Sequence, residues 1–453
     1  MVPPFVGSIP IVRPILSPKV TFRFFKPKSF KAEGFMHLSE PLQDRYLKLD
    51  EGTGGVHLVN HLEIEEKTFH TNGKPKVAIL LVGYGEVEDY ANFADYNESA
   101  LRLLTAKFVT IPDSLFFWVA KVLSFLDKRE WHSHGDFVSP HNRIFEDQRA
   151  GIEASLQRRF GEQVKVFKSF NFCKPFLPEQ VLQQIRSEGY ERVILYPLLV
   201  VDSVFTSGLA LQQFNEALSH QDRWIKAMRY LPSFFDAKDY HKLLAESFHQ
   251  SIQQAQGPYP SSQVGVILMN HGCPIDARGF TTGVDESVAL YESVRAEMIT
   301  RYPLISIGWL NHDTPGKWTT PDVTQAAKNL LHLGAKKLVF APIGFCTENH
   351  ETILDVAHIL EKFDKDGVPC QHLPCVNEDA QFCQMAAQWI EPLVGELLNV
   401  SELAEQSPVH NGHSHVEHSH NGHSHNGHAH NGHAHPHPHK QAHSHGDGHT
   451  HVH

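Results

Sequence analysis

The sequence predicts an α/β protein with two doubly wound, Rossmann-like lobes, each built on a parallel sheet, and a cleft between the lobes. Continuous apolar runs alternate with amphipathic stretches from residue 75 to residue 400, a pattern typical of buried parallel strands joined by helices. This rhythm occurs twice, and loops rich in Pro and Gln separate the two cycles at residues 230–260. Two of the later strands end in polar loops, which is where α/β folds place their chemistry.

The first cycle begins with the apolar run 77–82, which meets a turn at Gly83 and Gly85. A proline is favoured in the first turn of a helix, and Pro178 stands at such a position. We expect strands at residues 77–82, 164–167 and 192–201, and helices at residues 147–160 and 177–189.

The second cycle repeats this pattern. Pro321 and Gly334 mark the beginning and the end of one of its helices. We expect strands at residues 264–269, 305–310 and 337–343, and helices at residues 283–301, 321–334 and 351–363. The predicted organisation is an N-terminal extension that is partly disordered (1–74), a first lobe (75–240), a second lobe (241–400) and a disordered histidine-rich tail (401–453).

Composition narrows the class of protein. With 453 residues and 41% hydrophobic content, the chain can form one large domain or two to three ordinary ones. A net charge of −11 excludes a surface that as a whole binds nucleic acid. The six cysteines form no C-x-x-C pair, which indicates reduced thiols and a cytoplasmic protein. No apolar run is long enough to cross a membrane.

Both ends of the chain are unusual. The first 31 residues carry six basic residues, no acidic ones and several prolines, so a transit peptide and a loosely attached extension both remain open. Residues 410–453 hold eighteen of the 34 histidines and almost no bulky apolar side chain. Burial in such a segment cannot offset its chain entropy. Its neutral imidazoles can bind Ni²⁺, Co²⁺ or Zn²⁺, and a solvating tail with no role is the alternative.

The two polar loops hold the candidate chemistry. One apolar run ends at Asn270-His271-Gly272, and another leads to Glu348-Asn349-His350-Glu351-Thr352. A neutral imidazole that faces a carboxylate cluster can bind a divalent metal, move protons, or do both. Taken alone, these residues favour the interpretation of His271 as a loop histidine whose hydrogen bonds are satisfied.

In order and spacing, a series of short segments resembles the ferrochelatase family, whose members insert ferrous iron into a porphyrin. The resemblance runs from residue 77 to residue 390, nearly all of the part expected to fold. The segments are residues 80–85, residues 108–112, Ser139-Pro140 with Gln148, Tyr196-Pro197 with Thr206-Ser207-Gly208, Asn270-His271-Gly272, Trp318 with Pro321, residues 342–352, and Asn377.

The resemblance implies a lyase of heme biosynthesis that inserts a divalent metal, expected to be Fe²⁺, into a porphyrin. His271 would accept a pyrrole proton and serve as an inner metal ligand, and Glu351 would face it as a second ligand or proton relay. Glu348 would be an outer carboxylate on the metal path. The metal is a substrate, and no tightly bound cofactor is expected.

The porphyrin is the other partner that the resemblance implies, and a cleft between lobes suits its flat, apolar ring. Tyr84 would lie over the ring on the face opposite His271, unless it is a turn tyrosine that packs between loops. Ser139 and Thr206 would be further pocket residues. Residues 116–123 (FFWVAKVL) would form the pocket lip and touch a membrane as a peripheral contact. As an ordinary helix they would turn most of their side chains toward the core, and this is what we expect.

The chain departs from the family where Asp-His-x-Glu-Thr is usual, because its histidine, His350, stands one place later. A shift by one residue can reverse the direction of a side chain, so we expect His350 to point away from the pocket. This departure and the tail keep three alternatives open. They are a cobalt or nickel tetrapyrrole chelatase, a non-catalytic metal-storage or metallochaperone protein on a chelatase scaffold, and a tetrapyrrole-binding regulator.

Overall fold

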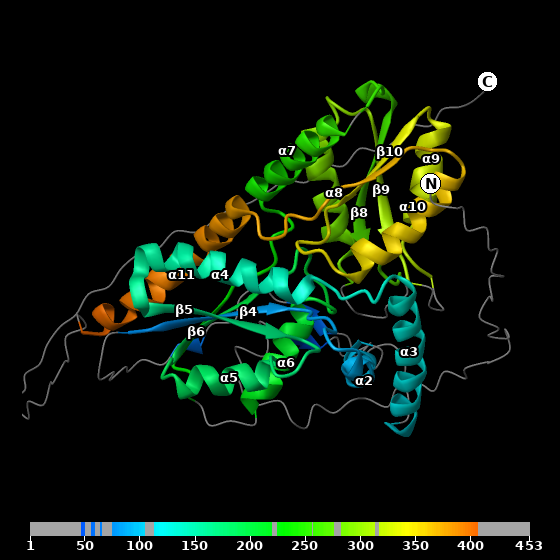
Figure 1. Ribbon diagram of the computed structural model, residues 1–453. Coiled ribbons are helices and arrows are strands. Elements are labelled where there is room, and N and C mark those ends of the chain that lie inside the picture. The colour runs from blue at the N-terminus through cyan, green and yellow to red at the C-terminus, as the bar shows by residue number, and fades with distance from the viewer. Residues whose placement is uncertain are drawn as a thin grey trace, which may run out of the picture. The chain divides into compact units, whose positions relative to one another are not determined.

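The described part of the chain contains two large, mainly parallel sheets with helices on their faces (Figure 1). The computed structural model describes residues 47–49, 56–58, 64–65, 75–104, 113–219, 224–255, 257–275, 282–312 and 317–405. The histidine-rich tail and the basic residues at the start of the sequence lie outside the described residues, and so the expectations for them stay predictions.

The first sheet has the strand order β3-β7-β6-β4-β5. Its four parallel strands are β4 (Val77–Gly83), β5 (Val164–Phe170), β6 (Arg192–Pro197) and β7 (Ala227–Tyr230). Every residue of β4 is buried, as a strand covered on both faces requires. An antiparallel edge strand, β3 (Ile64–Glu65), pairs with β7, so part of the segment expected as an extension belongs to this sheet. Before it, β1 (Leu47–Leu49) pairs with β2 (Val56–Leu58).

The second sheet has the order β11-β10-β8-β9 and is parallel throughout. Its strands are β8 (Val264–His271), β9 (Leu304–Leu310), β10 (Lys337–Pro342) and β11 (Cys370–His372). Its central strands β8 and β10 are apolar and buried along nearly their whole length, as the sequence pattern indicated.

The two lobes are wound in the same way. From β4 the chain moves to β5 on one side and then crosses to β6 on the other; from β8 it moves to β9 and then crosses to β10. β4 and β8 are therefore the switch points, and in such sheets a crevice lies at the carboxyl ends of the strands beside the switch point. The prediction of two doubly wound lobes is confirmed.

Helices cover both faces of each sheet (Figure 1). On the first sheet, one face carries α4 (His141–Phe160) and α11 (Ala380–Glu405), and the other carries α5 (Pro178–Ser187) and α6 (Ser207–Ser219). The second sheet lies between α7 (Lys238–Gln254) with α8 (Val284–Met298) and α9 (Val323–His332) with α10 (Val356–Lys365). Although α11 follows the second sheet in the chain, it packs on α4, and one apolar core includes residues of both sheets, such as Ile79 and Val266.

Most of the expected elements are present with shifted ends. β6 ends at Pro197, and the apolar residues 198–200 are buried in a loop instead of extending the strand. The helix expected at 351–363 begins as a π-helical turn, η5 (Glu351–Asp355), which continues into α10. Sequence patterns did not identify β7, β11, α6, α7 or α11. The domain boundaries drawn from the sequence stay predictions.

Residues 116–123 lie in α3 (Asp113–Ser133), beside α2 (Phe93–Leu104), and the expectation that most of their side chains face the core is wrong. Phe116 and Ala120 are buried, whereas large apolar side chains elsewhere on the helix are exposed: Leu115, Phe117, Trp118, Val119, Val122, Phe125 and Leu126. An amphipathic pattern indicates a helix but does not say how many of its sides are covered, and α2 is the main neighbour of α3 in the described part of the chain. Among the described helices, none has both the length and the apolar character needed to span a bilayer.

Candidate active site

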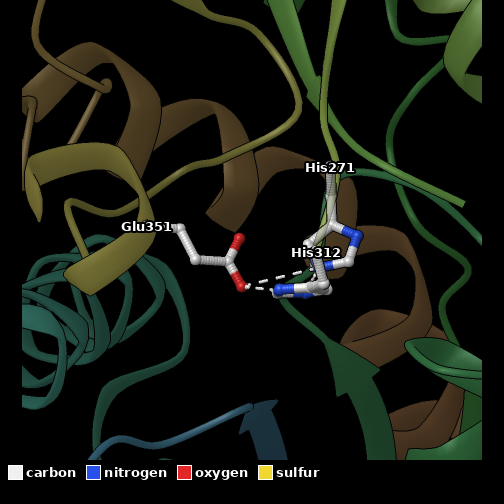
Figure 2. A group of neighbouring side chains, drawn as sticks. All are labelled: His271, His312 and Glu351. Carbon is white, nitrogen blue, oxygen red and sulfur yellow. Dashed lines mark hydrogen bonds and ion pairs between the residues drawn. The ribbon is translucent and has the colours of Figure 1, made fainter. Parts of the chain in front are cut away.

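Three side chains meet at the carboxyl edge of the second sheet (Figure 2). His271 is the last residue of β8, His312 lies two residues after β9, and Glu351 begins the η5 turn that follows β10. Because these strands are parallel neighbours, their carboxyl ends share one edge. The fold therefore brings His271 and Glu351 together, and it adds His312.

The three ligand atoms are spaced as if around one ion. The Nε2 atoms of His271 and His312 lie 3.5 Å and 3.8 Å from Oε1 of Glu351, and 3.1 Å from each other. Ligand atoms about 2.1 Å from a tetrahedral ion lie about 3.4 Å from one another, so the separations fit a common metal. Two imidazoles and one carboxylate suit Fe²⁺, Co²⁺, Ni²⁺ and Zn²⁺.

The ring of His271 is oriented by its own loop. Its Nδ1 lies 2.7 Å from the carbonyl oxygen of Gly272, and because a carbonyl only accepts, Nδ1 carries the hydrogen. In the neutral ring the lone pair is then on Nε2, the atom that faces Glu351 and His312. A Cβ at Gly272 would lie 2.6 Å from the carbonyl oxygen of Leu310, so this close approach of the two strand ends requires glycine.

The charges of this group depend on one another. Burial by itself would lower the pKa of His271 and raise that of Glu351. Their proximity reverses both effects, because the Glu351 carboxylate holds the pKa of His271 well above its ordinary value, and His271, followed by His312 and His350, holds the pKa of Glu351 well below its usual range. Both shifts favour a protonated His271 that faces the Glu351 carboxylate, and a dication that binds there then competes with a proton.

One oxygen of Glu351 is unsatisfied. The side chain is 12% exposed, and its Oε2 is buried with no hydrogen-bond partner in the part of the chain that the structure describes. Buried carboxylate oxygens are usually satisfied, so such an oxygen marks a place where a cation or a proton donor binds.

Glu348 is placed differently. Its Oε2 accepts a hydrogen bond from the Thr352 hydroxyl at 2.5 Å, and its Oε1 accepts one from the Cys375 N–H at 2.8 Å. Both oxygens are occupied, and Glu348 is not among the three grouped ligands. Its contacts fix the beginning of the η5 turn.

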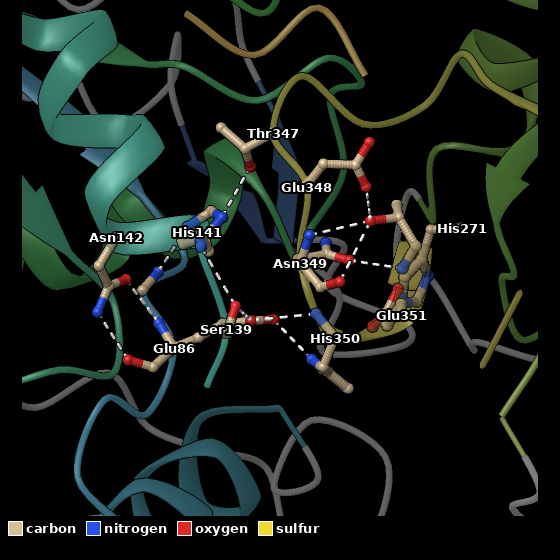
Figure 3. Close-up of polar contacts among 12 residues, drawn as sticks. Glu86, Ser139, His141, Asn142, His271, Thr347, Glu348, Asn349, His350 and Glu351 are labelled. Carbon is tan, nitrogen blue, oxygen red and sulfur yellow. Dashed lines mark hydrogen bonds and ion pairs between the residues drawn. The ribbon is translucent and has the colours of Figure 1, made fainter. Parts of the chain in front are cut away.

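His350 does not point away from the pocket, and that expectation is wrong. Together with His312 it lines a cavity of about 200 Å³, and its Nδ1 lies 2.6 Å from Oε1 of Glu86 (Figure 3). The residue begins a helical turn instead of lying in a strand, so the alternation of strand side chains does not apply. Burial would lower the pKa of His350, but Glu86 raises it to about 10. Ser139 donates its hydroxyl to the same Glu86 carboxylate.

Tyr84 and Thr206 meet at one loop of the first lobe. The Tyr84 hydroxyl donates to the carbonyl oxygen of Phe205 at 2.8 Å, and the Thr206 hydroxyl donates to that of Val201 at 2.6 Å. Burial, and next the charge of Glu351, raise the pKa of Tyr84 far above its ordinary value. The charge of Glu351, on the second lobe, therefore acts on Tyr84 of the first lobe.

A second group of possible ligands lies along the same turn. Asp355 of η5 and His358 of α10 face Glu130 of α3, with ligand atoms within 4.8 Å of one another. Burial, together with the charge of Glu351, raises the pKa of Asp355 to about 6. Asp355 and Glu130 also line the cavity that includes His312, so an acid-lined cavity adjoins the three-ligand group.

Sequence reasoning missed two functional candidates, His312 and Glu86. His312 follows an expected strand, and the rule that neighbouring parallel strands share a carboxyl edge could have identified it. Glu86 follows the Gly83-Tyr84-Gly85 turn, but its partner His350 is 264 residues away, and nothing in the local sequence indicates that pairing.

Comparisons with known proteins show which proteins this chain is similar to. The family model described as Ferrochelatase matches residues 76–393. The ferrochelatase of Synechococcus elongatus is 26% identical over 337 residues, which cover 70% of this chain and 82% of that protein. The ferrochelatase of a Synechocystis species is 25% identical with the same coverage. Among solved structures, SirB from Bacillus subtilis with Fe3+ aligns with 72% of this chain and 97% of its own, at 11% identity and a TM-score of 0.39.

The family match extends from β4, the first strand of the first lobe, into α11, and it includes His271, His312 and Glu351. Because it spans more than half of the sequence, this chain belongs to the ferrochelatase family.

Proposed function

We propose that this ferrochelatase-family enzyme inserts Fe²⁺ into a porphyrin in heme biosynthesis, with His271 and Glu351 as its catalytic side chains. The observation that carries the proposal is the meeting of His271, His312 and Glu351 at one strand edge. Two imidazoles and a carboxylate can hold a divalent metal and can accept protons. Insertion of a metal into a porphyrin needs both functions.

The order of events follows from the charges. Without a metal, Glu351 keeps His271 protonated, so His271 cannot yet act as a base. A dication held by Glu351 and His312 lowers the pKa of His271, which releases its proton to water. Nε2 of His271 then accepts the first pyrrole proton. As the metal passes into the ring, the second pyrrole proton leaves to water by way of Glu351, and the group returns to an imidazolium that faces a carboxylate.

The porphyrin belongs between the two switch points, with Tyr84 on one side and His271 on the other. The acid-lined cavity beside His312 offers the metal a route to the site, with Asp355 and Glu130 along it. Glu348 as an outer carboxylate, and Ser139 and Thr206 as porphyrin contacts, stay predictions, because their polar atoms bond to neighbouring protein groups.

A peripheral contact of α3 with a membrane is a further part of the proposal. Phe117, Trp118 and Phe125 are between 46% and 66% exposed, and the Lys121 ammonium lies over the Phe117 ring at 4.1 Å. Exposed aromatic side chains beside a lysine are typical of helices that lie in the membrane interface. The location that goes with this contact is the cytoplasmic surface of a membrane.

Cobalt or nickel insertion is the second candidate, and His312 is the observation that favours it. A second imidazole makes the group richer in nitrogen, which borderline metals such as Co²⁺ and Ni²⁺ prefer. The tail would bind Ni²⁺, Co²⁺ or Zn²⁺ in either case, and we expect no tightly bound cofactor.

A metallation assay tests these alternatives. The full-length chain is mixed anaerobically with protoporphyrin or coproporphyrin and with Fe²⁺, Co²⁺, Ni²⁺ or Zn²⁺, and the porphyrin absorbance is followed. We expect the highest kcat/KM with Fe²⁺. Higher values with Co²⁺ or Ni²⁺ would support the second candidate. Porphyrin or metal binding without insertion of any metal would leave a storage protein or a regulator.

A further inference from the structure

A buried carboxylate of the first lobe holds the residue that precedes Glu351. Glu86 follows β4 and is 7% exposed. Its Oε1 accepts a hydrogen bond from Nδ1 of His350 at 2.6 Å, and its Oε2 accepts one from the backbone N–H of His350 at 3.2 Å (Figure 3). Because His350 directly precedes Glu351, these two contacts fix the chain next to a metal ligand.

Glu86 is itself held in place by α4 and by a residue that precedes α4 in the chain. Its backbone N–H donates to Oδ1 of Asn142 at 2.9 Å, and its carbonyl oxygen accepts from Nδ2 of the same residue at 2.7 Å. The Ser139 hydroxyl donates to its Oε2. A buried carboxylate with these partners cannot rotate without leaving a charge unpaired. The position of His350 therefore depends on that of α4, because Glu86 bonds to both.

The shape of the turn is set by its own residues. Asn349 and Thr352 bond reciprocally, since each backbone N–H donates to the other side chain, at 2.9 Å and 2.8 Å. These local bonds form the beginning of η5 but do not determine its direction relative to the first lobe. Two contacts with the first lobe contribute that direction: the Glu86–His350 contact, and a hydrogen bond between His141 Nδ1 and the Thr347 hydroxyl at 2.7 Å.

We propose that Glu86 and His350 are a positioning pair that orients the Glu351 carboxylate toward His271 and His312, and so sets the metal affinity of the three-ligand group. This inference rests on the proposed function. The metal ligands all lie on the second lobe, yet their geometry depends on a carboxylate of the first. Groups that support metal ligands typically change metal affinity about 10- to 100-fold when they are removed.

A Co²⁺ titration of the full-length chain tests the pair. Visible absorption of Co²⁺ is recorded, and the titration of a His271→Ala variant is subtracted from each curve so that the signal of the histidine-rich tail cancels. In this difference, Glu86→Gln and His350→Gln are each expected to weaken Co²⁺ binding about tenfold or more. The double variant should be no weaker than the weaker single variant, because both substitutions break one contact.

Glu396→Gln is the matched control. It also removes a carboxylate from a long-range ion pair, with Arg229 at 2.7 Å, but on α11 and away from η5. This variant should melt at a lower temperature and bind Co²⁺ as the parent does. If Glu86→Gln does not fold, His350→Gln, whose side chain is 34% exposed, provides the same measurement.

The outcomes distinguish a failure of the positioning role from a failure of the proposed function. Unchanged Co²⁺ affinity in the variants, additive losses, or an equal loss in Glu396→Gln overturns the positioning role. The absence of a His271-dependent Co²⁺ signal in the parent overturns both the positioning role and the metal group. A parent that binds Co²⁺ at His271 but metallates no porphyrin refutes only the proposed function, and the titration still decides whether Glu86 and His350 position the ligand.

Discussion

The Nε2 atoms of His271 and His312 lie 3.1 Å apart, at the ends of two neighbouring strands. Two imidazole nitrogens this close repel each other if both are protonated, and they cannot form a hydrogen bond if neither is. A proton on one of the two nitrogens, or a metal between them, resolves this, and the carboxylate of Glu351 beside them favours a positive charge there. Exchange of that proton for a metal is the first chemical event that the group can perform.

The first prediction concerns His312, which we expect to affect metal choice more than turnover. His312→Ala leaves one imidazole and one carboxylate, and the loss of a nitrogen ligand weakens binding of Co²⁺ and Ni²⁺ more than that of Fe²⁺. The ratio of kcat/KM for Co²⁺ to that for Fe²⁺, measured on one porphyrin, should fall about tenfold or more.

His249→Ala is the control for this prediction. His249 lies on α7, where its Nδ1 is 2.9 Å from the Tyr302 hydroxyl, and its loss should leave the metal ratio unchanged. An unchanged ratio in His312→Ala as well would show that His312 is not a ligand of the substrate metal.

The second prediction concerns His271 as the proton acceptor. His271→Ala removes the base, and kcat should fall about 10²- to 10⁴-fold, while porphyrin binding, measured by quenching of its fluorescence, stays close to that of the parent. Metallation at the parent rate would remove His271 from the mechanism.

Local sequence patterns predicted much of the fold. The run 77–82 and the run 264–269 are apolar because both faces of β4 and β8 are covered by helices. β7 was missed because four residues that include Arg229 carry too weak a pattern. The exposed face of α3 was misjudged because an amphipathic pattern does not reveal how much of a helix its neighbours cover.

The site was only partly predictable for a related reason. His271 and Glu351 stand in motifs, whereas His312 joins them only because β9 lies next to β8, a pairing that depends on the order of strands in the sheet. His350 was expected to face the wrong way because the sequence did not reveal that a π-helical turn begins beside it. The role of Glu86 could be predicted only from the way the two lobes pack against each other, because its partner His350 lies on the other lobe.

The third prediction concerns the exposed face of α3. Replacing Trp118 and Phe125 together with Ser removes two aromatic side chains that are 64% and 66% exposed, and it should reduce co-sedimentation with liposomes several-fold at unchanged thermal stability. Leu333→Ser is the control, because Leu333 is 70% exposed at the end of α9, on the second lobe. Equal liposome binding by the parent and the double variant would argue against a membrane contact.

The fourth prediction concerns the tail. A chain that lacks residues 408–453 should keep its turnover and lose most of its Ni²⁺ binding, because that segment holds eighteen of the 34 histidines. Imidazole binds metal only when it is neutral, so Ni²⁺ binding by the full chain should fall as the pH drops below about 6.5. Equilibrium dialysis at two pH values measures both effects. Full Ni²⁺ binding by the shortened chain would contradict the assignment.

The last prediction is the pH dependence of the contact between Glu86 and His350. The pKa of His350 is raised from 6.5 to about 10, so its contribution to the free energy of unfolding is fully present below about pH 6.5 and is lost as the pH rises toward 10. The pKa of Glu86 is lowered from 4.5, so its contribution is present above that value and is lost as the pH falls below it. Both contributions are therefore greatest between about pH 4.5 and 6.5.

The melting temperatures of the parent and of Glu86→Gln, measured from pH 4 to pH 10, check this window. Their difference should be largest near pH 5.5 to 6.5 and should shrink steadily between pH 7 and pH 10, as the imidazolium loses its proton. In Glu396→Gln the lost partner is Arg229, and an arginine does not titrate in this range, so that difference should stay flat above pH 6. A flat difference for Glu86→Gln as well would mean that His350 is neutral at pH 7. The short contact would then be a neutral hydrogen bond, and no ion pair would join the turn of Glu351 to the first lobe.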